Sequence, residues 1–480
     1  MNQKILFYIN FFILFFNFAK QQNTTNKPNL PFNNDEITDK LPGLDFELKF
    51  KHYSGYLQVS QTRFFHYMLV TSKVDPINDP LIFWFNGGPG CSSLLGLFTE
   101  LGPYLINEDG TKLLENVYSW NNLASVVFME TPAGVGFSYS TDGNNTNNDN
   151  LVIVEEHYNA IKQFYKKYPN FRRNNVFITG ESYAGIYLPM LTSNIIKRKN
   201  NYPINLKGLL IGNGLLNSKL AGATTFEFIY NHGAIEESYW VDFVKKCCNG
   251  NIDNCNVDTL TGICAKTAYD FYNIYSQSSV NVYNIYQYCD NSPNGNSSTG
   301  MTFFYTKIKE NLAKRAGKYL TRHKRDESYN YDPSLIPCIP DATISNYLNN
   351  PEVLKALHIP SDKNLLWSAC TSNLDYSMVQ EDMTPFFNDI LKAKISIVLY
   401  YGDTDSVCPF LHGQKFIEKL NLTLISPRNF WYFNNQVAGT RTLFKGLTYL
   451  TVSGVGHMVP QWAPERALFI ANDTLNNMIY

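Results

Sequence analysis

One serine stands where an apolar run meets a helical pattern. The run Val176–Thr179 is followed by Gly180-Glu181-Ser182-Tyr183-Ala184. Small residues two positions before and after the serine let a strand and a helix approach, so the spacing predicts a strained turn that exposes the Ser182 hydroxyl. The common form of this nucleophile elbow has glycine where this chain has Ala184, and alanine is still small enough for that packing. Such a hydroxyl attacks carbonyl carbons once a base removes its proton.

An elbow serine needs a base and an acid, which follow it in the chain in the order serine, acid, histidine. Of the eight histidines, His457 is the best placed, because it follows the apolar run Leu447–Val452 in a glycine-rich loop. Two carboxylates, Asp403 and Asp405, follow the run Ile395–Tyr401. Asp405 lies further beyond the strand end, but the local pattern leaves both residues open as the acid.

Negative charge develops on the attacked carbonyl oxygen and needs preorganised N–H donors. The amide of Tyr183, directly after the serine, is one expected donor. The second donor is expected in the turn Asn86–Gly90, which follows the apolar run Leu81–Phe85, because glycines let the backbone approach a substrate closely. Together these residues predict acyl-transfer chemistry with a serine nucleophile.

Strand-like runs alternate with helical patterns over most of the chain. Continuous apolar runs closed by turn residues occur at 81–85, 125–129, 176–179, 206–211, 395–401 and 447–452. Helical patterns occur at 154–168, 183–198 and 384–391. This alternation predicts an α/β fold with a mostly parallel central sheet flanked by helices, and the elbow indicates the α/β-hydrolase fold.

The alternation breaks between residues 218 and 340. We therefore predict a signal peptide over 1–19, a first part of the α/β-hydrolase core over 40–217, an inserted, mainly helical cap domain over 218–335, and a second part of the core over 336–480. The cap contains a basic run, Lys314–Arg325, which fits either a solvated face or a loop that is cut during processing.

Composition limits the function and the compartment. The 480 residues include 41 acidic and 40 basic side chains, a balance that argues against a nucleic-acid partner. The apolar run Ile5–Phe18 follows Lys4 and is about 14 residues long, which is too short to span a bilayer and typical of a signal peptide. A membrane anchor is the alternative. No later stretch is apolar for long enough to span, so we expect a secretory-pathway protein without stable membrane insertion.

Nine cysteines suit an oxidising compartment, and their odd number leaves at least one unpaired in a monomer. A zinc site is the competing interpretation, but no CxxC pair occurs and the signal peptide favours disulfides. We predict no metal site and no cofactor. Five Asn-x-Ser/Thr sequons are candidate glycosylation sites: Asn23, Asn144, Asn296, Asn421 and Asn472.

Five blocks, in register over residues 45–475, resemble the serine carboxypeptidase family of lysosomal and vacuolar exopeptidases. The blocks are Trp84–Ser93, Thr131–Ser140, Gly180–Gly185, Gly402–Asp405 and Gly456–Pro460. The family also has alanine before the last glycine of its elbow. The resemblance implies a serine-type carboxypeptidase that releases C-terminal amino acids from peptides and proteins through an acyl-enzyme at acid pH, without a metal or an organic cofactor.

The resemblance assigns roles that the local pattern leaves open. It implies that Asp405 is the acid that acts with Ser182 and His457. It implies that the amides of Gly88 and Tyr183 are the oxyanion donors. It also implies that the substrate's terminal carboxylate binds to a polar cluster of Asn86, Gly87, Glu100 and Glu181. Two carboxyl groups held close cannot both ionise cheaply, so one stays protonated and donates a hydrogen bond, which predicts an acid optimum.

The resemblance also implies a set of disulfides and one free thiol: Cys91–Cys370, Cys247–Cys264, Cys248–Cys255 and Cys289–Cys338, with Cys408 unpaired. It implies a lysosomal, vacuolar or secreted location and leaves a homodimer open. Two rival functions remain: an acyltransferase or esterase on the same scaffold, and a binding protein that protects other lysosomal proteins. The expected carboxylate site favours the exopeptidase over the first rival.

Overall fold

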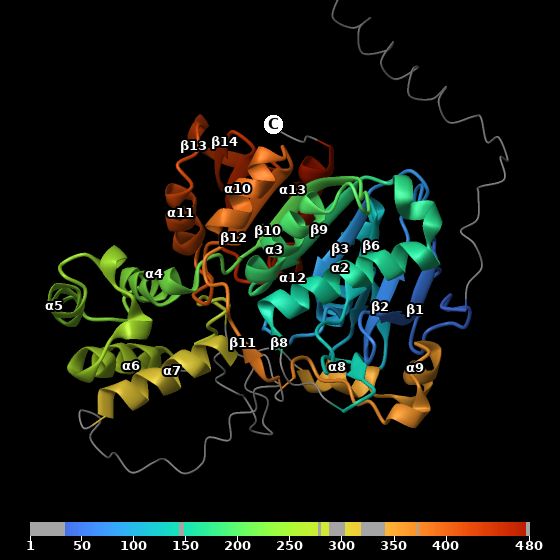
Figure 1. Cartoon of the computed structure of the whole chain (residues 1–480), viewed down its shortest axis with the longest axis horizontal. Coiled ribbons are helices and arrows are strands. Elements are labelled where there is room, and N and C mark those ends of the chain that lie inside the picture. Colours follow the sequence, from blue (N-terminus) through green and yellow to red (C-terminus); the bar gives the residue numbers. More distant parts are fainter. Residues whose placement is uncertain are drawn as a thin grey trace, which may run out of the picture. The chain divides into compact units, whose positions relative to one another are not determined.

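A large central sheet organises the chain. The computed structural model describes residues 34–143, 148–276, 280–287, 303–317, 341–371 and 374–476, and the expected signal peptide lies outside them. Within these ranges the largest sheet has 11 strands in the order β1-β2-β6-β3-β9-β10-β12-β15-β14-β13, with β7 paired to β2 (Figure 1). Its strands are β1 His52–Gln58, β2 Arg63–Val70, β3 Leu81–Phe85, β6 Ser125–Met129, β7 Tyr139–Ser140, β9 Val176–Glu181, β10 Leu206–Gly212, β12 Ser396–Gly402, β13 Leu424–Phe433, β14 Gln436–Phe444 and β15 Leu447–Val452.

The middle of the sheet is parallel. Strands β6, β3, β9, β10, β12 and β15 run in one direction, and the strands at both ends are antiparallel to their neighbours. Strands β3, β6, β9 and β12 are buried along their whole length. Side chains on both faces of such strands are covered, which explains why the sequence shows continuous apolar runs instead of alternation.

Helices cover both faces of the sheet. On one face α2 (Asn150–Lys167), α3 (Ala184–Lys197) and α10 (Thr384–Lys392) pack side by side (Figure 1). Phe83 of β3 meets Phe164 of α2 there, with ring centroids 5.3 Å apart. The next residue, Trp84, points to the opposite face, where α13 (Pro464–Asn476) contributes to the same core cluster.

The remaining elements are short or lie in the inserted stretch. The inserted helices are α4 Ser218–Asn231, α5 Glu237–Cys247, α6 Gly262–Ser276 and α7 Phe303–Ala316. The others are α8 Asp341–Leu348, α9 Pro351–Ala356, α11 Phe410–Lys419, α12 Val459–Trp462, η1 Gly96–Glu100, η2 Trp120–Asn122, η3 Pro169–Arg173, η4 Ile252–Asn254, η5 Val257–Thr259, η7 Ser361–Lys363, β4 Tyr104–Ile106, β5 Leu113–Glu115, β8 Asn148–Asp149 and β11 Tyr376–Ser377.

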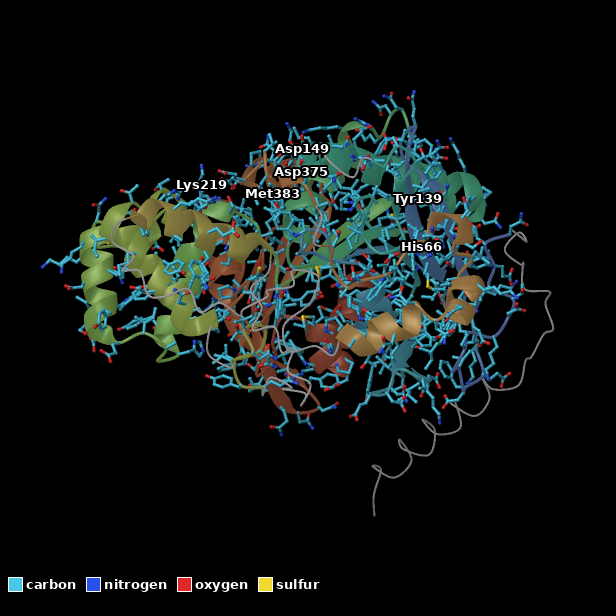
Figure 2. The ribbon with its side chains drawn as sticks, turned by 90° about the horizontal axis from the view of Figure 1, so that it is seen from below. His66, Tyr139, Asp149, Lys219, Asp375 and Met383 are labelled. Atoms are coloured by element: carbon cyan, nitrogen blue, oxygen red, sulfur yellow. A yellow bond between two sulfur atoms is a disulfide. The ribbon has the colours of Figure 1, made fainter. Side chains whose placement is uncertain are left out.

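The inserted helices join the core at the start of α4. The amide of Met383 donates to the carbonyl of Leu216 at 3.1 Å, and Lys219 forms an ion pair with Glu381 at 3.4 Å; Figure 2 labels Lys219 and Met383 in this region. Helix α4 also packs against α11, and α6 packs against α7. The stretch is mainly helical in its described part, whereas the cap boundaries stay a prediction.

The α/β architecture predicted from the sequence is confirmed, with a mostly parallel sheet between two layers of helices. None of the helices in the described ranges has the length and apolar character needed to cross a bilayer.

Candidate active site

Ser182 occupies the tight turn between β9 and α3, with a φ of 63°. A positive φ is strained for a residue with a side chain, and here neighbouring backbone groups hold it. The Ser182 amide donates to the Gly212 carbonyl at 3.0 Å, and the Ser182 carbonyl accepts from the amide of Leu215 at 3.0 Å. A Cβ on Gly180 would lie 2.3 Å from the Phe85 carbonyl oxygen, which explains the small residue before the serine.

Asp405 and His457 form a buried hydrogen-bonded pair. The His457 Nδ1 lies 2.6 Å from Asp405 Oδ2. Asp405 Oδ2 also accepts from Asn213 Nδ2 at 2.9 Å, and Asp405 Oδ1 accepts from the amide of Val407 at 2.9 Å. Asp403 has a different partner, because its Oδ1 accepts from the amide of Gly454 at 2.6 Å. The structure therefore separates the two carboxylates that the local sequence pattern left equivalent.

The serine and the Asp405–His457 pair lie at the same edge of the sheet. Strands β9, β10, β12 and β15 are neighbours and parallel, so the loops that follow them meet at their carboxyl ends. A chain of contacts joins these loops, since Ser182 binds Gly212 and the next residue, Asn213, binds Asp405. Asn213 was not predicted from the sequence, although a polar residue directly after a buried parallel strand is a usable signal.

The glycine-rich turn after β3 reaches the elbow. A Cβ on Gly87 would lie 2.6 Å from both the Ser182 Cβ and the Tyr183 amide nitrogen. Gly88 has a φ of 112°, which favours glycine. This contact brings the turn, and with it the expected Gly88 donor, to the side of Ser182 and the Tyr183 amide. Chemically, the loops at this edge of the sheet offer a hydroxyl, an imidazole backed by a carboxylate, and backbone amides.

Two carboxyl groups lie beside the elbow. Asn86 Nδ2 donates to Glu100 Oε1 at 3.1 Å and to Glu181 Oε1 at 2.9 Å. Burial raises the pKa of Glu100 to about 7. Burial and the neighbouring Glu100 carboxyl raise the pKa of Glu181 well above its usual range. The pair therefore retains a proton at acid pH, as expected for carboxyl groups that compete for one site.

Comparison with known proteins identifies the family. The family model for serine carboxypeptidases matches residues 42–477. The chain belongs to the serine carboxypeptidase family. It is 38% identical over 462 residues to mouse lysosomal protective protein, covering 93% of this chain and 94% of the relative. It is 35% identical over 459 residues to the serine carboxypeptidase ctsa-4.1 of Caenorhabditis elegans, covering 93% and 94%. The protein is therefore a serine-type carboxypeptidase, a hydrolase that acts on peptides.

The fold of this serine carboxypeptidase also matches a solved structure. The crystal structure of a prohormone-processing carboxypeptidase from Saccharomyces cerevisiae, Kex1, aligns with a TM-score of 0.68 and 23% identity, covering 89% of this chain and 91% of that chain. The likeness confirms the predicted α/β-hydrolase fold.

The cysteines of the serine carboxypeptidase form three bonds in the described part of the chain. The structure pairs Cys91 with Cys370, Cys247 with Cys264, and Cys248 with Cys255, which are pairs that the resemblance implies. Cys408 is free and buried, and burial raises the pKa of its thiol. The expected Cys289–Cys338 bond lies outside the described residues.

The other expected features of the carboxypeptidase are placed as follows. The sequon residues Asn421 and Asn472 are exposed, whereas Asn23, Asn144 and Asn296 lie outside the described residues. Part of the basic run, from Arg322 to Arg325, also lies outside them. Among the residues that the structure describes, no group of three or more His, Cys, Asp or Glu side chains is arranged to hold a metal ion.

Proposed function

We propose that Ser182, His457 and Asp405 hydrolyse the last peptide bond of the substrate. Ser182 Oγ attacks the carbonyl carbon, and His457 takes the hydroxyl proton on Nε2, because its Nδ1 faces Asp405 at 2.6 Å. The amides of Gly88 and Tyr183 hold the oxyanion. His457 then protonates the leaving amino group, and the terminal amino acid departs. Water, deprotonated by His457, attacks the acyl-enzyme and restores Ser182.

The carboxyl pair carries the proposal that the enzyme removes residues from the C-terminus. Glu181 directly precedes Ser182 and shares Asn86 with Glu100 at 2.9 and 3.1 Å. A protonated carboxyl group can donate a hydrogen bond to the substrate's terminal carboxylate, whereas an ionised one repels it. Together with Asn86 and the Gly87 amide, the pair holds the terminal carboxylate beside the nucleophile. The raised pKa values of both glutamates support activity at acid pH.

Turnover of a blocked dipeptide and of its C-terminal amide tests this proposal. We expect rapid release of the terminal amino acid from the free acid and much slower cleavage of the amide. Ser182→Ala should lower kcat by about 10⁶-fold, since loss of an activated serine nucleophile costs roughly that much in serine proteases. Equal turnover of acid and amide would instead favour an esterase or acyltransferase. Normal turnover by Ser182→Ala would exclude Ser182 as the nucleophile.

The location and the partners are also proposals. The N-terminal run supports entry into the secretory pathway, with the lysosome, the vacuole or the outside of the cell as destination, and the mouse relative is lysosomal by name. A homodimer and a protective binding role stay open. The Ser182→Ala variant separates the binding role from catalysis, because it should lose peptide cleavage and keep any protective binding.

A further inference from the structure

A short segment of the inserted stretch lies against both loops that carry the Asp405–His457 pair. The backbone of Asn281–Ile285 bonds to each loop. The His457 amide donates to the Tyr283 carbonyl at 2.8 Å. The amide of Ile285 donates to the Thr404 carbonyl at 3.1 Å, and the amide of Ser406 donates to the Val282 carbonyl at 3.1 Å. The residues on both sides of Asp405 are therefore tied to this segment.

Side chains strengthen the same contact. Thr404 Oγ1 donates to Asn284 Oδ1 at 2.8 Å, and Ser406 Oγ donates to the Val282 carbonyl at 2.5 Å. The side chains of Thr404, Ser406 and Asn284 are all buried. A buried hydrogen bond of this kind is costly to break, because the partner left behind stays unpaired away from water.

The segment has its own reason to hold this shape. Asn281 Oδ1 accepts from the amides of Tyr283 and Asn284 at 3.1 and 3.2 Å, which fixes a tight turn. The fit to the histidine loop is close, since a Cβ on Gly456 would lie 2.2 Å from the Tyr283 carbonyl oxygen and 2.6 Å from the Asn284 Cβ. The turn is thus wedged between the two loops.

We propose that Asn284 is a positioning residue, which acts through Thr404 to hold Asp405 against His457. The inference rests on the proposed roles of Asp405 and His457. Thr404 is adjacent to Asp405, and the Thr404 hydroxyl donates a hydrogen bond to the Asn284 side chain. Displacing a catalytic group by about 1 Å can cost roughly a hundredfold in rate. We therefore expect a residue of the inserted stretch, Asn284, to affect the kcat of the enzyme.

Two matched substitutions of Thr404 test the inference. Thr404→Val removes the hydroxyl and keeps the shape, whereas Thr404→Ser keeps the hydroxyl. We expect Thr404→Val to lower kcat on a blocked dipeptide by about ten- to hundredfold with KM within about twofold, and Thr404→Ser to recover most of the loss. Active sites are titrated with a serine-directed organophosphate, so that kcat is calculated per active enzyme molecule and misfolded enzyme does not lower it.

Asn284→Ala removes the acceptor and should reproduce the loss. In a double-mutant cycle, the Thr404→Val/Asn284→Ala enzyme should be no slower than the slower single variant, because both changes break one bond. Losses that multiply would overturn the inference, as would a rise in KM with unchanged kcat or a Thr404→Ser enzyme as slow as Thr404→Val. If Thr404→Val does not fold, the kcat and KM of Asn284→Ala decide: kcat at the wild-type level would overturn the inference.

Ser193→Ala serves as the matched control. It breaks a hydrogen bond to Asp389 at 2.6 Å, which joins α3 to α10 near the end of α3 remote from Ser182, and should leave kcat unchanged. The Ser182→Ala enzyme separates this inference from the proposed function. If Ser182→Ala is inactive while Thr404→Val and Asn284→Ala both turn over at the wild-type kcat, the positioning role is wrong and the mechanism stands. If Ser182→Ala is active, the mechanism itself fails.

Discussion

The carboxyl groups of Glu100 and Glu181 converge on one nitrogen atom, the Nδ2 of Asn86, at 3.1 and 2.9 Å. Asn86 is itself fixed, because its Oδ1 accepts from the indole of Trp84 at 2.7 Å. Both glutamates are buried, so a second negative charge at this point is unfavourable. In the proposed mechanism, this protonated pair is what accepts the terminal carboxylate of the substrate at acid pH.

This arrangement predicts how substrate binding depends on pH. Burial raises the pKa of Glu100 to about 7, so Glu100 is protonated below that pH and ionises above it. The extra negative charge then repels the terminal carboxylate of the substrate. KM for a blocked dipeptide with a free carboxylate should rise as pH increases through about 7, by up to tenfold per pH unit. Steady-state kinetics between about pH 5 and pH 8 measure this.

Glu100→Gln is the control for this prediction. Glutamine is close in shape and does not titrate, so the rise in KM near neutral pH should disappear. The C-terminal amide of the same dipeptide carries no charge to repel and should show no such rise. A KM that stays flat for the wild-type enzyme, or a rise that persists in Glu100→Gln, would contradict the assigned role of the pair.

The neighbouring carboxylates Asp403 and Asp405 should differ sharply in importance. Asp405→Asn places an amide group opposite the Nδ1 of His457 and favours the wrong tautomer of the ring. In serine proteases such a change lowers kcat by about 10⁴-fold, and a similar loss is expected here. Asp403→Asn should cost far less, because Asp403 bonds to the amide of Gly454 and not to the imidazole. Comparable losses in kcat for the two variants would argue against Asp405 as the acid.

The sequence predicted the middle of the sheet well and its β13 edge poorly. Strands such as β3 and β6 have both faces buried, so their sequences are continuous apolar runs. Strand β13 is mostly exposed and contains Pro427 and Asn429 with shifts in register, so neither hydrophobic pattern marks it. Helix α2 begins four residues before the predicted start because Asp149 caps it by accepting from the amides of Leu151 and Val152.

The residues of the candidate site also differ in how far the sequence predicted them. The positions of Ser182 after β9 and of His457 after β15 were predictable, because each residue follows an apolar run and stands near glycines. Choosing Asp405 over Asp403, and finding Glu100, required the family resemblance, since nothing near these residues in the sequence marks them. Asn213 and Asn284 were missed because their partners lie 192 and 120 positions away in the chain. Contacts over such distances are set by the fold and leave no periodic signal.

A single methyl group at Gly87 should block the active site. A Cβ there would lie 2.6 Å from the Ser182 Cβ and from the Tyr183 amide nitrogen, both of which belong to the rigid elbow. The turn must then move away and take the Gly88 amide, the proposed oxyanion donor, with it. Loss of one such donor lowers kcat by about 10² to 10³-fold, so Gly87→Ala should lower kcat at least that much.

Gly143→Ala is a useful comparison for Gly87→Ala. Gly143 has open space around its Cβ position and lies outside the site, although its φ of 68° makes alanine somewhat strained. It should lose some stability and keep its kcat. The two variants are compared by thermal unfolding and by kcat per titrated active site. A Gly87→Ala enzyme with normal kcat would show that the turn does not need this close approach.

The disulfide between Cys91 and Cys370 should matter for both stability and catalysis. It joins the end of the glycine-rich turn to a segment 279 residues later, next to backbone bonds from Ser92 to Ala369 at 2.8 Å and from Thr371 to Gly90 at 2.9 Å. Replacing both cysteines by serine should lower the free energy of unfolding by about 2–5 kcal/mol. It should also lower kcat, because the turn beside Ser182 loses its covalent anchor.

The Cys247–Cys264 pair closes a loop of only 17 residues between inserted helices, so its removal should lower stability with little change in kcat. Chemical denaturation and kcat measured on both double variants would decide, and equal effects on kcat would show that the Cys91–Cys370 bond has no special role at the site.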